Sequence, residues 1–569
     1  MRLALGLLVS AIFIVQPFLA PAADAARPNV LLIMTDDQGW GDFSFHGNPH
    51  LKTPHLNRLA SQSVELSQFY VSPVCTPTRA SLMTGRYNYR TGAIDTYLGR
   101  ATMAADETTL AELLANAGYR TGIFGKWHLG DNYPSRAIDQ GFAEALVHRG
   151  GGVGQPADPP GNSYFDPTLI HNGREVKTQG YCSDVFTNAA IHFIAQRRDE
   201  PFFAYLAYNC PHTPLQVPRQ YYDRYKGMSL DDDTAKLYGM VANIDDNIGR
   251  LLAKLEELKL ADNTIVVFLT DNGPQARRYN GILNDLKGSV HDGGIHVPCL
   301  LRWPGKFQAG GKIDVVAAHI DIVPTLLAAC DVSAPRDLKL DGVNLLPVLL
   351  REQVAIPERL LFFQWHRGDR PQPFRACAAR GPRFKLVQPE GRGDKEQFDE
   401  AWALYDMAVD PGELHNVIES HAPLAAEMKS AYQTWFADVS ATRGFPVPRI
   451  VVGTKHENPV TLTRQDWRGP QAGWRNDGLG HWEVDVAQAG LYDITVRTPA
   501  EPTARTVRLR IGQIDETQPL AVQADRAKFE SVRLEPGQYR VEASVERGQS
   551  RAGAHYVDLL AREVPATDR

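Results

Sequence analysis

Two short apolar runs, far apart along the chain, constrain its fold more than any other feature of the sequence. They occupy residues 30–34 and 264–269. An apolar run of this length is typical of a strand buried on both faces, as in a sheet that helices cover on both sides. Each run is followed by side chains that carry oxygen atoms: Asp36 and Asp37 after the first, Asp271 and Asn272 after the second. Function gathers at such strand ends in α/β proteins, so we expect both ends to belong to a functional site.

Helical and strand patterns alternate from residue 28 to about residue 303. The predicted elements are helices at residues 53–63, 108–117 and 234–260, and strands that begin near residue 119 and cover residues 202–208. In the longest of these helices, apolar side chains recur every three or four positions. Alternation of this kind predicts a large α/β domain, which we place at residues 26–357.

The pattern changes twice toward the carboxyl terminus. Shorter strands near residues 360–365 and 384–387, followed by a helix at residues 423–439, predict an α+β subdomain at residues 358–449. Beyond it, apolar and polar side chains alternate in short segments that Gly and Pro turns separate. This pattern predicts an appended β-sandwich at residues 450–569.

The first 25 residues have the layout of a secretory signal peptide. Arg2 precedes an apolar stretch at residues 3–19, and small residues at positions 20–25 offer two cleavage points. A membrane anchor is the alternative, although the stretch is short for a span. We therefore expect a secreted or periplasmic protein with no membrane attachment after signal cleavage. The formal net charge of -6 gives no reason to expect a nucleic-acid partner.

A cysteine motif at residues 75–86 connects these predictions to a known family. Cys75 is followed at fixed offsets by Pro77 and Arg79, and a short apolar run then closes with Thr-Gly-Arg. This stretch resembles the maturation signature of the type I sulfatases. The three-residue pattern alone also occurs by chance in chains of this size, so its interpretation depends on the motifs described next. The resemblance implies that a formylglycine-generating enzyme oxidises Cys75 to formylglycine (3-oxoalanine), whose hydrated aldehyde attacks the sulfur of a sulfate ester.

Three basic residues match the residues that surround formylglycine in this family. Lys126 and His128 lie two positions apart after a predicted strand, which places them on one side of an extended backbone. The resemblance implies that Lys126 holds the formylglycine and a sulfate oxygen, and that His128 takes the diol proton that allows sulfate to leave. It also implies that Arg79 holds the diol through charge-assisted hydrogen bonds. Without this context, a Lys-x-His pair is more often exposed surface.

The four residues at the two strand ends are candidates for a metal site. Carboxylate and amide oxygens suit a hard cation such as Ca²⁺ or Mg²⁺ rather than Zn²⁺ or Cu²⁺. Each pair could instead cap a helix or begin a turn. Asp36, Asp37, Asp271 and Asn272 match the sulfatase metal ligands position by position, and the resemblance adds Cys75, as formylglycine, to the set. It implies Ca²⁺, which the sequence alone does not distinguish from Mg²⁺.

Two further residues match the family positions near the leaving oxygen. His212 lies in the segment Pro-His-Thr-Pro, after the predicted strand at residues 202–208, and Lys287 lies in the segment Leu-Lys-Gly. The resemblance implies that either residue could serve as general acid or as electrostatic stabiliser. On its own, His212 could equally be a turn histidine.

The chain departs from the common family pattern at three positions. Thr78 stands where serine is most usual, Asp292 where glutamate is usual, and His296 where arginine is usual. The cysteine, proline and arginine of the signature are present, so we expect the chemistry to persist, whereas substrate contacts around His291, Asp292 and His296 are left open. Candidates for the mouth of the pocket are Trp40, Tyr97, Leu98 and the glycine loop at residues 150–154, for which ordinary packing is the simpler interpretation.

The resemblance covers residues 28–449 and implies an alkaline-phosphatase-like α/β fold with a large central mixed sheet flanked by helices. The expected activity is hydrolysis of a sulfate ester to an alcohol and inorganic sulfate, by an arylsulfatase-type enzyme. Because the chain is expected to be exported and to carry a β-sandwich, we expect a sulfated carbohydrate as substrate, by analogy of fold. The alternatives are a phosphate or phosphonate monoester hydrolase of the same fold and an inactive relative that binds glycans. The oligomeric state is left open.

Overall fold

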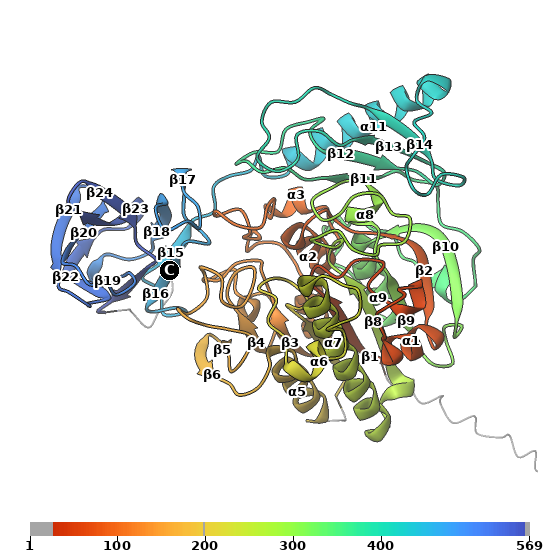
Figure 1. The fold of residues 1–569 in the computed structure, drawn as a ribbon, viewed down its shortest axis with the longest axis horizontal. Helices are drawn as coiled ribbons and strands as arrows, with labels where there is room; N and C mark the ends of the chain where they lie inside the picture. Colours follow the sequence, from red (N-terminus) through yellow and green to blue (C-terminus); the bar gives the residue numbers. More distant parts are fainter. Residues whose placement is uncertain (1–26, 197–199, 564–569) are drawn as a thin grey trace, which may run out of the picture.

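A ten-stranded mixed sheet forms the centre of the computed structural model, which describes residues 27–196 and 200–563 (Figure 1). The predicted signal peptide at residues 1–25 lies outside these described residues. The order of the strands across the sheet is β10-β2-β9-β8-β1-β7-β3-β4-β5-β6. The strands are β1 Asn29–Thr35, β2 Val64–Tyr70, β3 Arg120–Lys126, β4 Glu144–His148, β5 Thr168–His171, β6 Arg174–Lys177, β7 Phe202–Ala207, β8 Thr264–Thr270, β9 Cys299–Arg302 and β10 Gly311–Ala318.

The two apolar runs of the sequence form neighbouring strands, β1 and β8, in the middle of this sheet. The strands are parallel, and their register pairs Thr35 with Thr270. Every residue of both strands is buried. The polar side chains that follow the two strands therefore start from the same edge of the sheet.

Helices cover both faces of the sheet, and each face has its own hydrophobic core. Side chains on β1 alternate between the two: Val30, Leu32 and Met34 pack on one face, and Leu31 and Ile33 pack on the other. The first core includes α2 Cys75–Thr84, α4 Leu110–Asn116 and α9 Ile322–Ala329, and the second includes α1 Pro54–Ser61, α5 Cys182–Ala195 and α7 Asp232–Glu257. The remaining helices of this region are α3 Asn88–Thr91, α6 Arg219–Tyr222, α8 Asp292–Ile295 and α10 Leu346–Leu349.

The helices predicted for this region are present, with small shifts of their ends. The longest described helix is α7, and the carboxylate of Asp231 caps it by accepting a hydrogen bond from the amide of Thr234. Helix α4 begins after Thr109, which forms a capping box with Glu112. Within residues 27–196 and 200–563, no helix combines the length and the hydrophobicity that crossing a bilayer requires.

A smaller α+β unit follows the central sheet. Its four-stranded antiparallel sheet consists of β11 Leu361–Gln364, β12 Cys377–Arg380, β13 Phe384–Gln388 and β14 Ala403–Asp406. Helix α11 Ala422–Ala441 packs against this sheet through Ala425 and Met428. The elements predicted at residues 360–365, 384–387 and 423–439 correspond to β11, β13 and α11.

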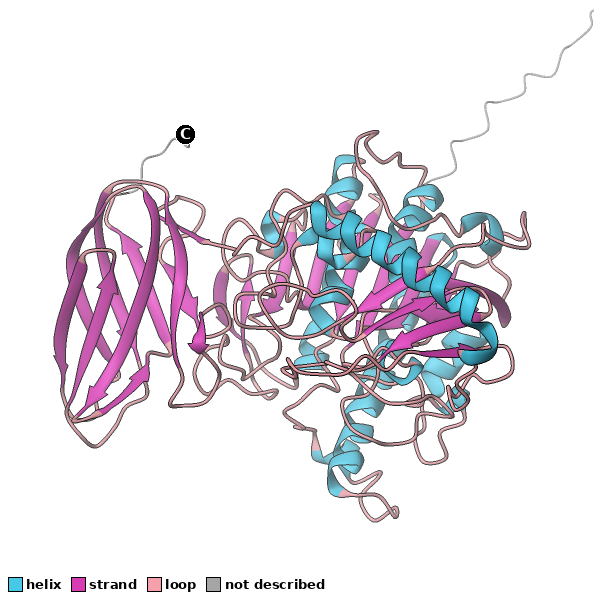
Figure 2. Cartoon of the chain, turned by 90° about the horizontal axis from the view of Figure 1, so that it is seen from above, coloured by secondary structure: helices cyan, strands magenta, loops and turns pink. Residues whose placement is uncertain are grey.

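The carboxyl-terminal region is a sandwich of two β-sheets (Figure 2). The strand orders are β15-β18-β23-β20-β21, with β17 beside β18 and β24 beside β23, and β16-β25-β19-β22. Trp467 and Trp482 lie in the core of the sandwich, together with Leu98 from the central-sheet region. The strands are β15 Ile450–Val452, β16 Val460–Thr463, β17 Arg468–Gln471, β18 Leu479–Val486, β19 Gly490–Arg497, β20 Arg505–Ile511, β21 Ile514–Leu520, β22 Arg526–Leu534, β23 Gly537–Arg547, β24 Ser550–Gly553 and β25 Tyr556–Ala561.

Polar contacts anchor the sandwich to the central-sheet region. The Glu457 carboxylate accepts hydrogen bonds from the backbone amide of Tyr133 at 2.7 Å and from the side-chain amide of Asn132 at 3.1 Å. The Tyr556 hydroxyl donates to the carbonyl oxygen of Asp158 at 2.6 Å. Because Asn132 and Asp158 belong to separate loops, the sandwich is held at more than one point.

Candidate active site

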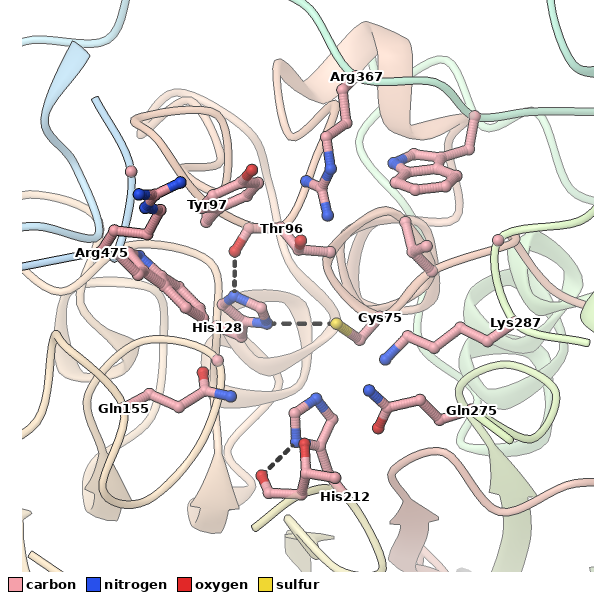
Figure 3. Close-up of a pocket in the computed structure, with 17 residues that line it drawn as sticks. Cys75, Thr96, Tyr97, His128, Gln155, His212, Gln275, Lys287, Arg367 and Arg475 are labelled. Atoms are coloured by element: carbon pink, nitrogen blue, oxygen red, sulfur yellow. Dashed lines mark hydrogen bonds between the residues drawn. The ribbon is translucent and has the colours of Figure 1, made fainter. Parts of the chain in front are cut away.

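A cavity of about 840 Å³ opens where the loops of the central-sheet region, the α+β unit and the β-sandwich meet (Figure 3). The predicted site residues that line it are Cys75, His128, His212 and Lys287. Residues of the two other regions complete the wall: Trp365 and Arg367 from the α+β unit, and Gly473, Trp474 and Arg475 from the sandwich. All three parts of the chain therefore shape one cavity.

The predicted metal ligands come together at the edge of the sheet because β1 and β8 are neighbours. The amide of Asp271 donates to the carbonyl oxygen of Thr35 at 3.1 Å, and the amide of Asp37 donates to a carboxylate oxygen of Asp271 at 3.1 Å. Asp37 has a φ of 62°, in the left-handed region that non-glycine residues rarely adopt. Asp36, Asp37, Asp271 and Asn272 are all buried.

These four residues fit a divalent cation. Among the described residues, Asp36 Oδ1, Asp37 Oδ2 and Asn272 Oδ1 are buried oxygens without a hydrogen-bond partner. Ligand atoms of Asp36, Cys75 and Asp271 lie within 4.8 Å of one another. Buried oxygens left unpaired are costly unless a ligand satisfies them, and a set of carboxylate and amide oxygens suits a hard cation. The site thus has unpaired oxygen atoms of the kind that serve as ligands to Ca²⁺ or Mg²⁺.

Cys75 is the first residue of α2, a buried helix that the sequence patterns did not predict. Its Sγ lies 3.6 Å from His128 Nδ1, and burial raises the pKa of the thiol. Arg79 lies one helical turn further on, where it donates hydrogen bonds to an Asp271 carboxylate oxygen at 2.7 Å and to the Lys126 carbonyl oxygen at 3.0 Å. The helix therefore presents the thiol and a guanidinium group to the metal-ligand cluster.

Lys126 and His128 follow at the end of β3. Gly125 precedes them with a φ of 119°, and a Cβ atom there would lie 1.8 Å from the carbonyl oxygen of Ala207, so only glycine lets β3 pass β7 in this conformation. Lys126 Nζ lies 2.5 Å from Asp36 Oδ2. The close approach of β3 to β7 thus fixes the backbone position from which the Lys126 and His128 side chains extend.

His128 is oriented with one ring nitrogen toward Cys75. Its Nε2 lies 2.8 Å from the Thr96 carbonyl oxygen, which can only accept, so Nε2 carries the proton and Nδ1 faces Cys75 with its lone pair. Burial, followed by the charge of Lys126, holds the pKa of His128 well below its usual range. The imidazole is therefore neutral at pH 7, and Nδ1 can accept a proton.

His212 and Lys287 line the cavity beside Asp37. The Nδ1–H of His212 donates to the Thr213 carbonyl oxygen at 2.7 Å, and its Nε2 lies 3.6 Å from Asp37 Oδ2. Lys287 Nζ lies 2.5 Å from Asp37 Oδ1. Burial lowers the pKa of His212 to about 4. Burial also acts to lower the pKa of Lys287, but the neighbouring anionic groups, Asp37 foremost, together outweigh it and raise that pKa.

The positions at which the chain departs from the family pattern lie outside this cavity. Asp292 accepts hydrogen bonds from the Tyr70 hydroxyl at 3.1 Å and from Lys385 Nζ at 2.5 Å, and Lys385 also lies 2.8 Å from a carboxylate oxygen of Glu413. His296 lies beside Asp292 in the same buried network. Since β13 carries Lys385, the network joins the α+β unit to the central-sheet region and does not line the cavity.

We expect replacement of Lys385 by methionine to destabilise the protein strongly. The change leaves the buried carboxylates of Asp292 and Glu413 without their common cation, which costs about 3–5 kcal/mol for a buried ion pair. Thermal unfolding measures the effect as a fall in Tm. The matched control is Lys395→Met, because Lys395 pairs with Glu390 on the surface, where the expected change is small. Equal Tm values for the two variants would contradict the prediction.

The other pocket candidates divide between the cavity wall and the packed interior. Tyr97 and Gly151 line the cavity. Trp40 stacks on His46 with ring centroids 4.0 Å apart, and Leu98 packs into the core of the sandwich. Lining residues that the sequence did not single out are Thr96, Gln155, Gln275, Trp365, Arg367, Trp474 and Arg475. They lie outside the motifs that the sequence shows, and no spacing in the sequence connects them to Cys75.

Comparisons with known proteins show the family to which the chain is similar. A protein-family model described as "Sulfatase" matches residues 28–332, and a model described as "N-sulphoglucosamine sulphohydrolase, C-terminal" matches residues 285–436. The first match spans more than half of the chain and contains every predicted site residue, from Asp36 to Lys287.

Individual relatives cover much of the same region. The N-acetylgalactosamine-6-sulfatase of Homo sapiens is 34% identical over 370 residues, which cover 60% of this chain and 69% of that protein. The arylsulfatase A of Bos taurus is 32% identical over 462 residues, which cover 72% of this chain and 87% of that protein. Among solved structures, Ps i-CgsB in complex with k-i-k-neocarrahexaose matches with a TM-score of 0.65 and 29% identity, over 72% of this chain and 92% of that chain.

Proposed function

The chain belongs to the sulfatase family of sulfuric ester hydrolases, and we propose that its cavity hydrolyses sulfate esters of saccharides through residue 75. The observation that carries this proposal is the position of Cys75. Its thiol lines the cavity 3.6 Å from a neutral histidine nitrogen, on the helical turn that also carries Arg79. A nucleophile at this position would meet a bound ester among buried cations that offset the ester's negative charge.

Cys75 needs a chemical change before it can serve as this nucleophile. Burial raises the pKa of the thiol, so the unmodified side chain stays protonated and is a weak nucleophile at neutral pH. As formylglycine, residue 75 would supply a hydrated aldehyde oxygen as the attacking atom. We assign the change to a formylglycine-generating enzyme, since Pro77 and Arg79 of the maturation signature are present.

Arg79, Lys126 and His128 would bind residue 75 and move its protons. Arg79 and Lys126 are buried cations that Asp271 and Asp36 hold in place, so their orientation costs no rearrangement when the ester binds. Both can donate charge-assisted hydrogen bonds to oxygens on residue 75 and on the sulfate. His128 Nδ1 faces residue 75 without a proton and would accept one when sulfate leaves.

Lys287 and His212 would act at the leaving oxygen. Both line the cavity and contact Asp37, so they lie on the same side of the site. Lys287 supplies a fixed positive charge, and His212 presents Nε2 because its other nitrogen donates to the backbone. We assign electrostatic stabilisation of the leaving oxygen, and a hydrogen bond donated to it, to Lys287; His212 would donate to that oxygen only in its protonated form, in which Nε2 also carries a hydrogen.

Asp36, Asp37, Asp271 and Asn272 would hold a divalent cation, for which we propose Ca²⁺, with residue 75 beside them. When bound, such a cation neutralises negative charge on the sulfate oxygens. The partnerless oxygens of three of these residues support the assignment. So does the donor set of carboxylate and amide oxygens, to which His212 and Cys75 add one nearby nitrogen and one nearby sulfur rather than the imidazole and thiolate sets typical of structural zinc.

A saccharide is the substrate class that the comparisons and the cavity favour. The names of the relatives include an N-acetylgalactosamine-6-sulfatase, and the structure of Ps i-CgsB contains a neocarrahexaose. The cavity of about 840 Å³ is much larger than a sulfate group needs and falls in the range of sites that bury ligands of drug size. Export, proposed from the amino-terminal sequence, would place the enzyme with extracellular glycans.

A panel of defined sulfated saccharides, read by the release of inorganic sulfate, tests the proposal. We expect the matured protein to hydrolyse at least one of them with a kcat/KM above that for small aryl sulfates. Phosphate and phosphonate monoesters with the same alcohol groups form the control series. Faster turnover of that series would assign the cavity to a phosphate or phosphonate monoester hydrolase, and no turnover of any ester would favour an inactive, glycan-binding relative.

A further inference from the structure

The outer part of the cavity wall combines aromatic rings and arginines from all three regions of the chain. Tyr97 lies in the central-sheet region, Arg367 in the α+β unit, and Trp474 and Arg475 in the β-sandwich. In Figure 3, Tyr97, Arg367 and Arg475 lie together on the side of the cavity opposite His212. The assigned chemistry of Cys75, His128, His212 and Lys287 uses none of these four residues.

Contacts within the wall hold the side chains of Tyr97, Arg367 and Trp474 in place. Arg367 donates hydrogen bonds from one nitrogen to both carboxylate oxygens of Asp95 at 3.1 Å, and its guanidinium carbon lies 4.2 Å from the centroid of the Tyr97 ring. The rings of Tyr97 and Trp474 meet edge to face, with centroids 5.2 Å apart and planes at 71°. A binding surface made of such fixed side chains loses little entropy when a ligand docks.

The segment of the sandwich that carries Trp474 is fixed against the catalytic residues. The side-chain amide of Gln465 donates to the Thr96 carbonyl oxygen at 2.8 Å, the same oxygen to which His128 donates. The backbone carbonyl oxygen of Gln465 accepts a hydrogen bond from the backbone amide of Gly99 at 2.9 Å. The Arg468 side chain donates a hydrogen bond to the backbone carbonyl oxygen of Gly99 at 2.9 Å. These contacts fix the sandwich as one wall of the cavity, so it is not a separate module joined to the rest of the chain by a linker alone.

The chemistry of the wall suits an anionic sugar. The rings of Trp474 and Tyr97 offer apolar surface against which a pyranose ring can pack. The indole Nε1 of Trp474 is buried and, among the described residues, has no hydrogen-bond partner. The two guanidinium groups can pair with sulfate or carboxylate oxygens, and Arg475 is exposed apart from its contact with the neighbouring Asp477.

We propose that Tyr97, Arg367, Trp474 and Arg475 form a subsite for the sugar residue next to the one that carries the scissile sulfate. The subsite selects saccharides of two or more residues in which this neighbouring residue bears its own sulfate or carboxylate group. This inference rests on the proposed function and narrows its substrate class. It assigns the sandwich a role in choosing the substrate rather than in the chemistry.

The test compares Trp474→Ala and Arg475→Ala on three substrates: a disulfated disaccharide, the same disaccharide with only the scissile sulfate, and 4-nitrophenyl sulfate. Loss of a hydrogen bond to a charged group predicts a fall of roughly 10- to 100-fold in kcat/KM for the disulfated disaccharide with Arg475→Ala, mainly through KM. We expect a smaller fall for the monosulfated disaccharide and less than about 3-fold for the aryl sulfate. Trp474→Ala should lower kcat/KM for both disaccharides.

Arg526→Ala is the matched control. Arg526 is an exposed arginine of the same sandwich, it pairs with the adjacent Asp525 as Arg475 pairs with Asp477, and it does not line the cavity. We expect its kinetics to equal those of the unchanged protein. The subsite would be overturned if Trp474→Ala and Arg475→Ala lowered kcat/KM equally for all three substrates, or lowered it for none of them.

Binding to a Cys75→Ala variant separates this inference from the proposed function. Calorimetry with the disulfated disaccharide measures recognition without turnover, and adding Arg475→Ala should weaken that binding. A protein that hydrolyses no sulfate ester yet binds the disaccharide through Arg475 would overturn the function and leave the subsite standing. Equally efficient hydrolysis of monosulfated monosaccharides and of the disulfated disaccharide would support the proposed function and overturn the subsite.

Discussion

Replacement of Cys75 by alanine is expected to lower sulfate ester hydrolysis by about 10⁴-fold or more, the range seen when an enzyme loses its nucleophile. Alanine can neither be oxidised to an aldehyde nor present an oxygen to the sulfur. The cationic side chains and the proposed divalent cation remain in this variant and would together still bind the ester, so the loss should appear in kcat rather than in KM. Initial rates on the best saccharide of the panel measure the effect.

Cys299→Ala is the control for the loss of a thiol. Cys299 is a buried free cysteine on β9, and it does not line the cavity, so its variant should keep full activity. Mass spectrometry of the peptide that contains residue 75 should show, in the active protein, the mass expected for replacement of CH2–SH by CHO. Full activity of Cys75→Ala, or an active protein whose peptide carries only cysteine, would refute the mechanism.

The parts of the site that could be predicted from the sequence lie at the ends of strands with a clear hydrophobic pattern. Asp36 and Asp271 follow apolar runs of the length and composition typical of buried strands, and the sheet then places the runs side by side. Helix α2 was not predicted because its buried residues include Thr76, Thr78 and Arg79, which give no apolar period. Its burial follows from the polar partners that the folded site supplies, which local sequence does not reveal.

The outer wall could not be predicted for a different reason. Gln465 and Trp474 contact residues near position 97 that are more than 350 positions away, and neither lies in a motif. An alternating pattern predicts that a β-sandwich forms, but it says nothing about which loop faces the cavity. Conversely, Asp292 and His296 occupy a recognisable motif, yet they form a structural network with Lys385.

The charges of the site explain why a cation belongs in it. Three buried carboxylates, Asp36, Asp37 and Asp271, face the three cationic side chains of Arg79, Lys126 and Lys287. With all three carboxylates ionised, as a bound cation would keep them although burial and Asp36 raise the pKa of Asp271 to about 7, three negative and three positive charges cancel, and His128 and His212 are neutral at pH 7. A neutral cluster offers little attraction to an anionic ester. A divalent cation would give the site two positive charges, which suit the sulfate group.

Removal of divalent cations from the matured protein is therefore expected to abolish activity and to lower Tm. Without the cation, Asp36 Oδ1, Asp37 Oδ2 and Asn272 Oδ1 are buried and unsatisfied, and their cost reduces the stability of the fold. A ligand present at 100 times its Kd stabilises the folded state by about 2.7 kcal/mol, so chelation with EGTA should lower Tm by several degrees. Added Ca²⁺ should restore both Tm and activity, and at a lower concentration than Mg²⁺.

Two variants assign this response to the proposed ligands. In Asp271→Asn the dependence of Tm on Ca²⁺ should vanish, because one of the three carboxylates proposed to hold the ion is lost. The control is Asp246→Asn, which alters a second acidic cluster, formed with His55 and Asp245 where α1 meets α7, and should leave the Ca²⁺ response intact. Thermal unfolding with and without Ca²⁺ measures the change in Tm for both variants, and it does not require an active enzyme. A Ca²⁺ response that persists in Asp271→Asn, or that disappears only in Asp246→Asn, would place the cation elsewhere in the protein.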